Sequence, residues 1–264
     1  MPSLPNLVVT GSFNLSGKAI TLLASGEWRE FVSVPDGEIY GIAEFGGFRF
    51  LAIRGGKPGV LRINSAFVID KRVSFPKADP HCIYIENGVV HLVSSSEDTI
   101  HKFDLDLNPV GSDVFGLGGD VRFHTNDVTR IGSKFFVSMF TDKADGNWSA
   151  NVAQGFVKAD TQIAPSSMDW AISGLVKPHS PVLFKDDLWV ADSGRGAVWC
   201  NSTKVFQEAG AWTRGLCVDG DYIHVGVANY DRTGQAKIVT LTRSGDIVRE
   251  VRLPLSCVYG IQLI

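Results

Sequence analysis

Short apolar runs separated by glycine-rich turns recur along the whole chain, and each run has the length of a strand rather than of a helix. Residues 50–53 lead through Arg54-Gly-Gly-Lys-Pro-Gly59 to the run at 60–63. Residues 188–191 lead through Asp192-Ser-Gly-Arg-Gly196 to the run at 197–200. No window of about 11 residues combines i, i+3, i+4, i+7 apolar spacing with capping residues. The pattern predicts an all-β protein built from hairpins.

Six such hairpins occur, which gives 264/6 = 44 residues per repeat. They lie at 7–22, 50–63, 90–103, 135–158, 188–200 and 222–241. A period of about 40–50 residues with four short strands per unit is typical of a β-propeller. We therefore predict one domain over residues 1–264, a six-bladed β-propeller. An open pair of β-sandwiches is the alternative, but it does not account for six repeated hairpins.

The two ends of the chain fit closure of such a ring. Residues 258–264 have the pattern of an innermost strand with no partners after it, and residues 6–34 that of outer strands with no innermost strand before them. One blade made from both termini would leave no long exposed edge. The predicted blades are 257–264 with 5–34, 38–76, 79–116, 122–172, 177–208 and 212–254.

One polar or aromatic side chain recurs where each innermost strand would begin. These residues are Tyr40, His81, His124, His179, Arg214 and Tyr259. Equivalent positions on the innermost strands of a propeller face a common channel, so we predict that the six side chains form a ring at one end of it. The next residue in each case is small, or is glycine, which leaves room for a pocket.

His81, His124 and His179 come from three consecutive blades and are the predicted metal ligands. Imidazole nitrogen suits divalent transition metals such as Zn²⁺, Mn²⁺ or Fe²⁺, and three protein ligands with an open position are typical of a catalytic centre. A purely structural role for each histidine is the alternative. Asp79, just before Pro80, is more typical of turn chemistry than of a site.

Positive charge near the ring favours an anionic ligand. Arg214 offers a fork of donors to a carboxylate or phosphate, and it is also a predicted catalytic residue, because with the metal it would stabilise the enolate-like charge that develops on proton removal. Lys177 adds charge at the rim, unless it is simply a solvated surface lysine. Asn126 and Asp127 follow His124 and are candidates for binding substrate or for orienting a histidine.

Tyr40 and Tyr259 are the predicted acid–base residues, because a phenol exchanges protons when a nearby cation lowers its pKa. Simple packing of the two rings across the channel mouth is the alternative.

Composition removes several classes of function. A net charge of −3 and a pI near 6.1 leave no basic footprint for nucleic acid. We find no signal peptide and no apolar run of about 20 residues, so we expect a cytoplasmic protein without a membrane partner. The four cysteines lack CxxC spacing and are expected to be reduced thiols.

Four sequence segments, which lie mainly within residues 120–230, resemble those of a known family. They are His124-Thr-Asn-Asp-Val, Pro178-His-Ser-Pro, Leu188-Trp-Val-Ala-Asp-Ser-Gly-Arg-Gly and Thr213-Arg-Gly-Leu. They resemble an uncharacterised bacterial propeller family found near polysaccharide-assembly genes. The chain is more distantly similar to six-bladed calcium-dependent lactonases and strictosidine-synthase-like proteins. Those lactonases use Glu, Asn and Asp at the channel, and histidines stand here instead, so their activity is not carried over.

A three-histidine site in a propeller is more similar, by type of site, to that of oligogalacturonate lyases, which abstract a proton next to a metal-bound uronate carboxylate. Our leading hypothesis is a metal-dependent epimerase or lyase acting on a sugar, or a sugar nucleotide, that bears a carboxylate or phosphate. A non-catalytic propeller that binds a glycan or a protein is the alternative from another class. A lactonase-like hydrolase is a third possibility and would need an acidic metal ligand such as Glu44 or Asp127.

Overall fold

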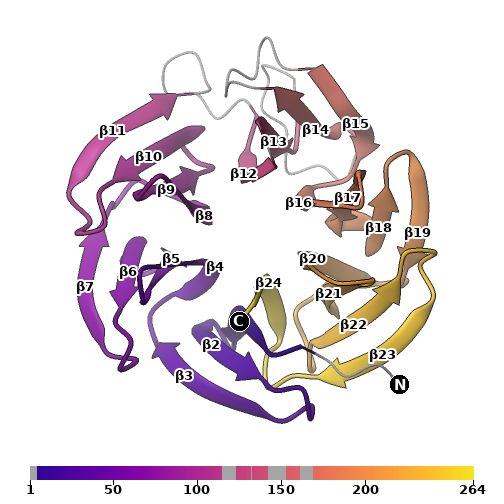
Figure 1. Cartoon of the computed structure of the whole chain (residues 1–264), viewed down its shortest axis with the longest axis horizontal. Coiled ribbons are helices and arrows are strands. Elements are labelled where there is room, and N and C mark those ends of the chain that lie inside the picture. Colours follow the sequence, from indigo (N-terminus) through magenta and orange to yellow (C-terminus); the bar gives the residue numbers. More distant parts are fainter. Residues whose placement is uncertain (1–4, 115–122, 132, 142–152, 161–168) are drawn as a thin grey trace.

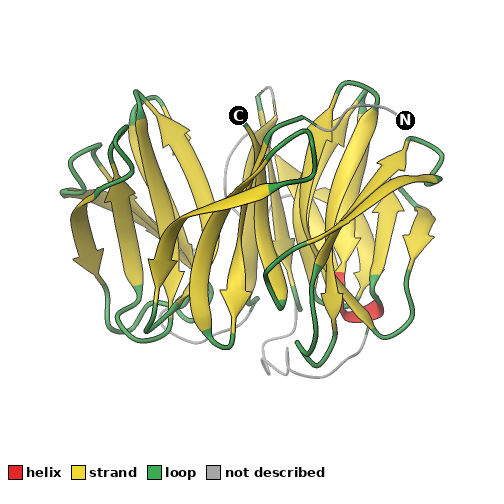
Figure 2. Cartoon of the chain, turned by 90° about the horizontal axis from the view of Figure 1, so that it is seen from below, coloured by secondary structure: helices red, strands yellow, loops and turns green. Residues whose placement is uncertain are grey.

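The computed structural model describes residues 5–114, 123–131, 133–141, 153–160 and 169–264. Its 24 strands form six four-stranded antiparallel sheets, which stand like blades around a central axis (Figure 1). Seen from the side, the strands run between the two faces of a thick disc (Figure 2). The six-bladed β-propeller predicted from the sequence is therefore confirmed. The described part has one helix, a single 3-10 turn at Ser193–Arg195, and no helix there is long and apolar enough to cross a bilayer.

Within each blade, the strands follow one another from the channel outward. The first blade is β24 (Cys257–Leu263), β1 (Leu7–Phe13), β2 (Ser16–Leu22) and β3 (Trp28–Val34). The second is β4 (Glu38–Phe45), β5 (Phe48–Arg54), β6 (Gly59–Ile63) and β7 (Ile69–Ser74), and the third is β8 (Pro80–Glu86), β9 (Val89–Ser94), β10 (Thr99–Phe103) and β11 (Pro109–Val114). The fourth is β12 (Thr125–Ile131), β13 (Lys134–Met139), β14 (Gly155–Asp160) and β15 (Asp169–Leu175). The fifth is β16 (Pro178–Phe184), β17 (Asp187–Asp192), β18 (Ala197–Cys200) and β19 (Thr203–Gln207), and the sixth is β20 (Ala211–Asp219), β21 (Tyr222–Asn229), β22 (Lys237–Thr242) and β23 (Ile247–Arg252).

The ring is closed by the chain ends, as predicted. β24 pairs antiparallel with β1 from Leu7↔Leu263 to Ser12↔Cys257. The predicted blade limits agree with the strands, although parts of the predicted third and fourth blades, at 115–122, 142–152 and 161–168, lie outside the described residues. All four cysteines are free thiols.

Apolar side chains fill the spaces between neighbouring blades. Trp189 of β17 is fully buried, and it packs with Val225 of β21 and Leu241 of β22 from the next blade. Similar clusters occur at other blade interfaces. Because strand side chains alternate between the two faces of a sheet, each blade contributes one set to each neighbour. The blades are thereby held at a fixed angle, which holds the channel open.

Every innermost strand has a β-bulge near its start. The pairing skips Tyr40, His81 and Tyr259 in three blades. In the other three, the bulge falls at residues 126–127, 180–181 and 215. A bulge leaves extra residues unpaired and redirects side chains. The six predicted ring positions therefore lie where regular pairing is interrupted, beside the channel.

Closure depends on a residue without a side chain at Gly11, because a Cβ there would lie 2.0 Å from the carbonyl oxygen of Cys257 on β24. We expect Gly11→Ala to lower the free energy of unfolding by about 1–3 kcal/mol, since β1 and β24 must separate to admit the methyl group. Thermal unfolding followed by circular dichroism measures this. Ser33→Ala, at an exposed position of β3, is the control. Equal melting temperatures for the two variants would contradict this account of closure.

Candidate functional site

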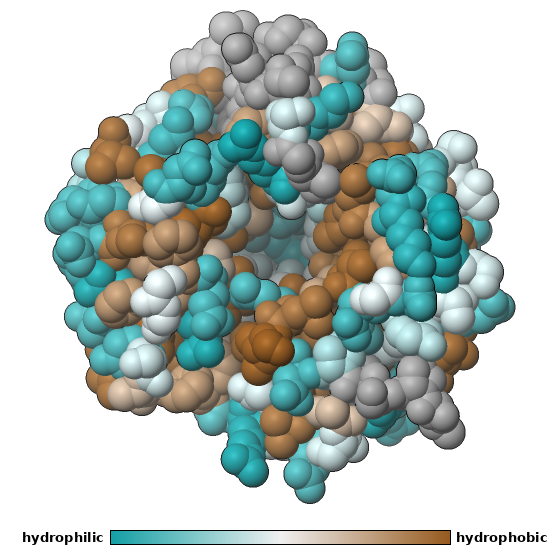
Figure 3. Space-filling model, viewed as in Figure 1, coloured by the Kyte–Doolittle hydropathy of each residue, from teal (hydrophilic) through white to brown (hydrophobic). Residues whose placement is uncertain are grey.

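A cavity of about 280 Å³ opens at one end of the channel. Figure 3 shows the channel from the opposite face, where the innermost strands end, as a hollow in the centre. All six predicted ring residues line this cavity, which therefore brings together one side chain from each innermost strand or its start. The remaining lining residues are Arg54, Phe140, Lys177, Trp212, Tyr230 and Arg232.

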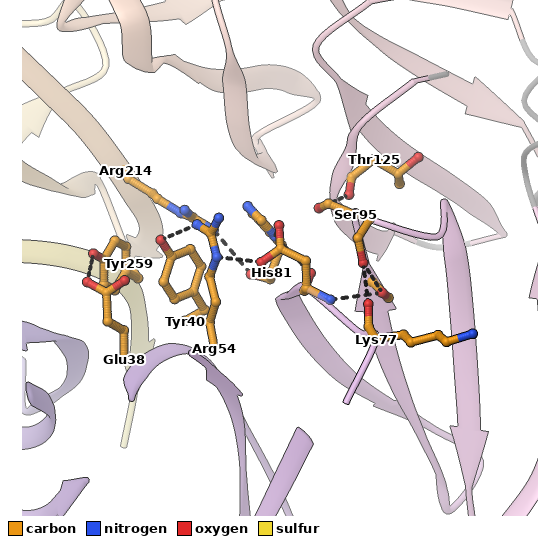
Figure 4. A network of polar contacts seen from close by, with 12 residues as sticks. Glu38, Tyr40, Arg54, Lys77, His81, Ser95, Thr125, Arg214 and Tyr259 are labelled. Atoms are coloured by element: carbon orange, nitrogen blue, oxygen red, sulfur yellow. Dashed lines mark hydrogen bonds and ion pairs between the residues drawn. The ribbon is translucent and has the colours of Figure 1, made fainter. Parts of the chain in front are cut away.

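Arg214 reaches across the channel and is only 3% exposed. Its Nη2 donates a hydrogen bond of 3.2 Å to the carbonyl oxygen of His81, on the opposite blade (Figure 4). Its guanidinium carbon lies 4.6 Å from the centre of the Tyr40 ring and 5.2 Å from that of Tyr259. Its Nε has no hydrogen-bond partner within the described part of the chain. A buried guanidinium with an unused donor favours an anion beside it.

Tyr40 and Tyr259 are stacked, with ring centroids 4.0 Å apart. The Tyr259 hydroxyl donates to Glu38, and burial raises the pKa of that tyrosine, so it keeps its proton. The Tyr40 hydroxyl instead accepts a hydrogen bond of 2.6 Å from Arg54 Nη1 (Figure 4). The two predicted acid–base residues are therefore not equivalent, because only Tyr40 has an O–H that is not already directed at a carboxylate.

Hydrogen bonds assign the tautomers of two histidines. His81 Nδ1 lies 3.0 Å from the carbonyl oxygen of Asp79, which only accepts, so Nδ1 carries the hydrogen. His179 Nδ1 lies 2.8 Å from Ser193 Oγ. That hydroxyl donates its one hydrogen to the carbonyl oxygen of Thr213, so His179 must donate to it. Both imidazoles thus keep the lone pair of Nε2 for a metal or a proton.

The three predicted histidines are neutral near pH 7. Burial is the main cause: it lowers the pKa of His124 to about 3 and the pKa values of His81 and His179 well below the usual range. The positive charges of Arg214 and Arg54 act in the same direction. Neutral imidazole is the form that binds metal ions and accepts protons.

A candidate metal centre consists of Asp79, His81 and His124, whose ligand atoms all lie within 4.8 Å of one another. One carboxylate and two neutral imidazoles are suitable donors for Zn²⁺, Mn²⁺ or Fe²⁺. His179 is not part of this group. The Phe140 ring lies between them, its centroid 4.6 Å from that of His124 and 5.2 Å from that of His179. The expected convergence of three histidines on one point is thus replaced by two histidines and an aspartate, and a ligand role for each of them stays a prediction.

Lys177 lines the cavity, whereas Asn126 and Asp127 do not. Asn126 is buried, and its Nδ2 donates to the carbonyl oxygen of His124. Asp127 accepts a hydrogen bond from the Ser180 N–H and lines a second, smaller cavity of about 100 Å³, to which Tyr40 and Tyr259 also contribute. Substrate contacts by these two residues stay a prediction.

Sequence reasoning missed Asp79 as a candidate ligand, and it missed Arg54, Phe140 and Tyr230 altogether. Asp79 resembled a turn residue, although it stands two positions before His81. The other three come just at or after the ends of β5, β13 and β21, the second strands of their blades. Because second strands run antiparallel to innermost strands, their ends meet the starts of those strands at the same mouth. The antiparallel pairing of the first two strands of each blade was therefore the signal from which these three residues could have been placed at the mouth.

Glu44, considered as an acidic ligand for a lactonase-like site, is exposed near the far end of β4 and forms an ion pair with Arg49. It does not line the cavity.

The fold and the site define a six-bladed β-propeller with a cationic, histidine-containing channel mouth. The chain belongs to the family described as domain of unknown function (DUF4915), whose model matches residues 63–247. No curated protein matches it.

Solved structures are similar at low sequence identity. A propeller in a nidogen/laminin complex has 11% identity and a TM-score of 0.72, with 98% of this chain and 97% of that chain covered. A putative 6-phosphogluconolactonase from Bacteroides fragilis has 13% identity and a TM-score of 0.65, with 99% and 98% covered. A catalytically inactive histidine-to-alanine variant of virginiamycin B lyase from Staphylococcus aureus has 16% identity and a TM-score of 0.55, with 83% and 71% covered. At these identities the likeness establishes the fold alone.

The lowered pKa of His124 makes the folded protein lose stability in acid. The unfolded chain binds a proton on this residue near pH 6.5, and the folded chain only near pH 3. The free energy of unfolding therefore falls as the pH drops through this window, by up to about 1.4 kcal/mol per pH unit for one residue. Urea unfolding at about pH 7 and about pH 4.5 should show a smaller loss for His124→Gln than for the wild type. Equal losses would contradict a neutral buried His124.

Proposed function

We propose that the protein is a metal-dependent lyase or epimerase that removes a proton from a sugar bearing a carboxylate or phosphate. The observation that carries this proposal is the cavity in which a buried Arg214, its Nε without a partner in the described residues, faces neutral histidines. Positive charge binds the anion, and imidazole lone pairs accept a proton or hold a metal. Both requirements of the reaction meet in one enclosed space.

Two groups of lining residues would bind different parts of the substrate. Arg54, Arg214 and Arg232 lie around the tyrosine pair, with guanidinium carbons 4.6–5.9 Å from a tyrosine ring centre. These three guanidinium groups bind the carboxylate or phosphate of the substrate. Trp212, on β20 like Arg214, lies toward the fifth blade, with its ring 5.7 Å from that of His179 and 5.6 Å from that of Tyr230. A pyranose packs its apolar face on such aromatic surfaces, as other flat rings do.

Proton transfer is assigned to His179 and Tyr40. They come from β16 and β4, on opposite sides of the channel (Figure 1). His179 Nε2 takes the proton from the carbon next to the carboxylate, and the electron pair of the broken C–H bond moves toward the carboxylate, where Arg214 stabilises the charge. For elimination, the C–O bond of the leaving group breaks as C=C forms, and Tyr40 O–H protonates the departing oxygen. For epimerisation, Tyr40 returns a proton to the opposite face.

Asp79, His81 and His124 are the residues that would hold the divalent metal. When bound there, the metal supplies Lewis-acid stabilisation of the carboxylate oxygens. The low pKa values of both imidazoles keep them in the form that binds metal.

Two other functions have a specific observation behind them. The structure of a nidogen/laminin complex shows that a propeller of similar fold occurs in a protein complex, which favours a non-catalytic binding module. The likeness to a putative 6-phosphogluconolactonase, with Asp79 as an acidic ligand, favours a hydrolase. Incubation with galacturonate oligomers and with a sugar lactone separates the three: an unsaturated or epimerised product, a ring-opened acid, or no reaction.

Arg214 is expected to recognise the anionic group. Arg214→Gln should weaken binding of galacturonate roughly 10- to 100-fold, because hydrogen bonds to a charged partner contribute about 1.5–3 kcal/mol. Arg214→Lys keeps the charge without the planar fork, so its affinity for galacturonate should lie between those of the wild type and Arg214→Gln. Isothermal titration calorimetry measures the affinities, with Arg243→Gln, an exposed arginine paired with Asp187, as the control. Galactose, which lacks the charge, should bind far more weakly than galacturonate, and equal binding of the two sugars would sink this assignment.

The two tyrosines provide a matched pair for the acid–base role. Tyr40→Phe should lower turnover of the galacturonate oligomer by roughly 10²- to 10⁴-fold, as loss of a general acid does, with little change in KM. Tyr259→Phe should affect turnover much less, because its proton is held by Glu38. A larger loss for Tyr259→Phe would reverse the assignment.

A further inference from the structure

Two cations can bind the carboxylate of Asp79: a metal ion and the guanidinium of Arg54. That carboxylate is in the candidate metal group with His81 and His124. The same carboxylate forms an ion pair with Arg54, through Oδ1, while Oδ2 lies 3.7 Å from His81 Nδ1. As a result, one oxygen is already engaged by a cation before any metal is bound.

Arg54 in turn belongs to the anion side of the cavity. It lines the cavity, donates to the Tyr40 hydroxyl and lies 5.0 Å from the centre of the Tyr40 ring. An anion held by Arg214 beside Tyr40 is therefore within the surroundings of Arg54 and competes with Asp79 for its guanidinium. Arg54 stands between the two halves of the site.

The charges around the cavity give this competition a direction. Four cations line it: Arg54, Lys177, Arg214 and Arg232. Two carboxylates meet these cations in the described residues, Asp79 with Arg54 and Glu38 with Arg232. A divalent cation entering alone adds to a positive surplus, whereas an anion entering first reduces it.

We infer that Arg54 couples the two ligands: an anionic substrate draws Arg54 away from Asp79, and the freed carboxylate then binds the metal. Metal and anion therefore bind with positive cooperativity, and Arg54 is a positioning residue that makes metal loading depend on substrate. This inference rests on the metal site of the proposed function and adds a regulatory property to it. By linkage, the metal must strengthen anion binding by the same factor.

The test is a calorimetric titration of Mn²⁺ into wild-type protein, with and without saturating galacturonate, with free Mn²⁺ corrected for chelation by the sugar acid. We expect galacturonate to tighten Mn²⁺ binding at least about tenfold, within the usual range of coupling between sites. In Arg54→Gln, Asp79 has no competing cation, so Mn²⁺ should bind more tightly than to the wild type without any anion, and galacturonate should add little. Arg54→Lys should keep most of the coupling.

Several outcomes are decisive. The inference is wrong if Arg54→Gln binds Mn²⁺ no more tightly than the wild type in the absence of anion, a comparison that does not depend on the choice of sugar. It is also wrong if galacturonate binds but leaves the Mn²⁺ affinity unchanged; the proposed function then survives without the coupling. If no Mn²⁺ or Zn²⁺ binds to the wild type under any condition, the metal site itself fails. Circular dichroism and Arg243→Gln control for folding and for loss of a surface charge.

Discussion

The buried guanidinium of Arg214 is the interaction on which the site depends. A charge removed from water is costly unless other groups replace its hydration. The carbonyl oxygen of His81 and the faces of Tyr40 and Tyr259 do so in part, from three other blades. The same charge contributes to keeping the neighbouring histidines neutral. Because Arg214 is buried in the channel, the cavity carries positive charge and its histidines nevertheless keep free lone pairs.

The fold makes this placement possible through closure and bulges. Six blades each bring an innermost strand to one channel, and the pairing of β24 with β1 closes the circle so that the first and last blades meet. The bulges then interrupt regular pairing at the level of the ring. Side chains redirected by a bulge become available to the channel. Tyr40 and Tyr259 serve both core and site, because they line the cavity and also pack in an apolar cluster with residues of the first and sixth blades.

Asp79 and Arg54 show how closely the acidic and basic parts of the site are linked. One ion pair joins the candidate metal group to the side of the cavity that suits an anion. In a medium of low effective dielectric constant, neither half is electrostatically independent of the other. The chemistry of the channel is therefore a property of the whole ring of blades rather than of one motif.

The sequence by itself determined the six hairpins, the blade made from both termini and the identity of six residues at the channel mouth, because strand period, turn residues and repeat length are local patterns. It did not determine which of these residues meet. Phe140 separates His179 from His124, and Asp79 takes the third place in the metal group. Asn126 and Asp127 form the bulge of β12 and do not line the larger cavity. These outcomes depend on contacts between blades, where one unpaired residue changes the direction of a side chain, and only the tertiary structure decides them.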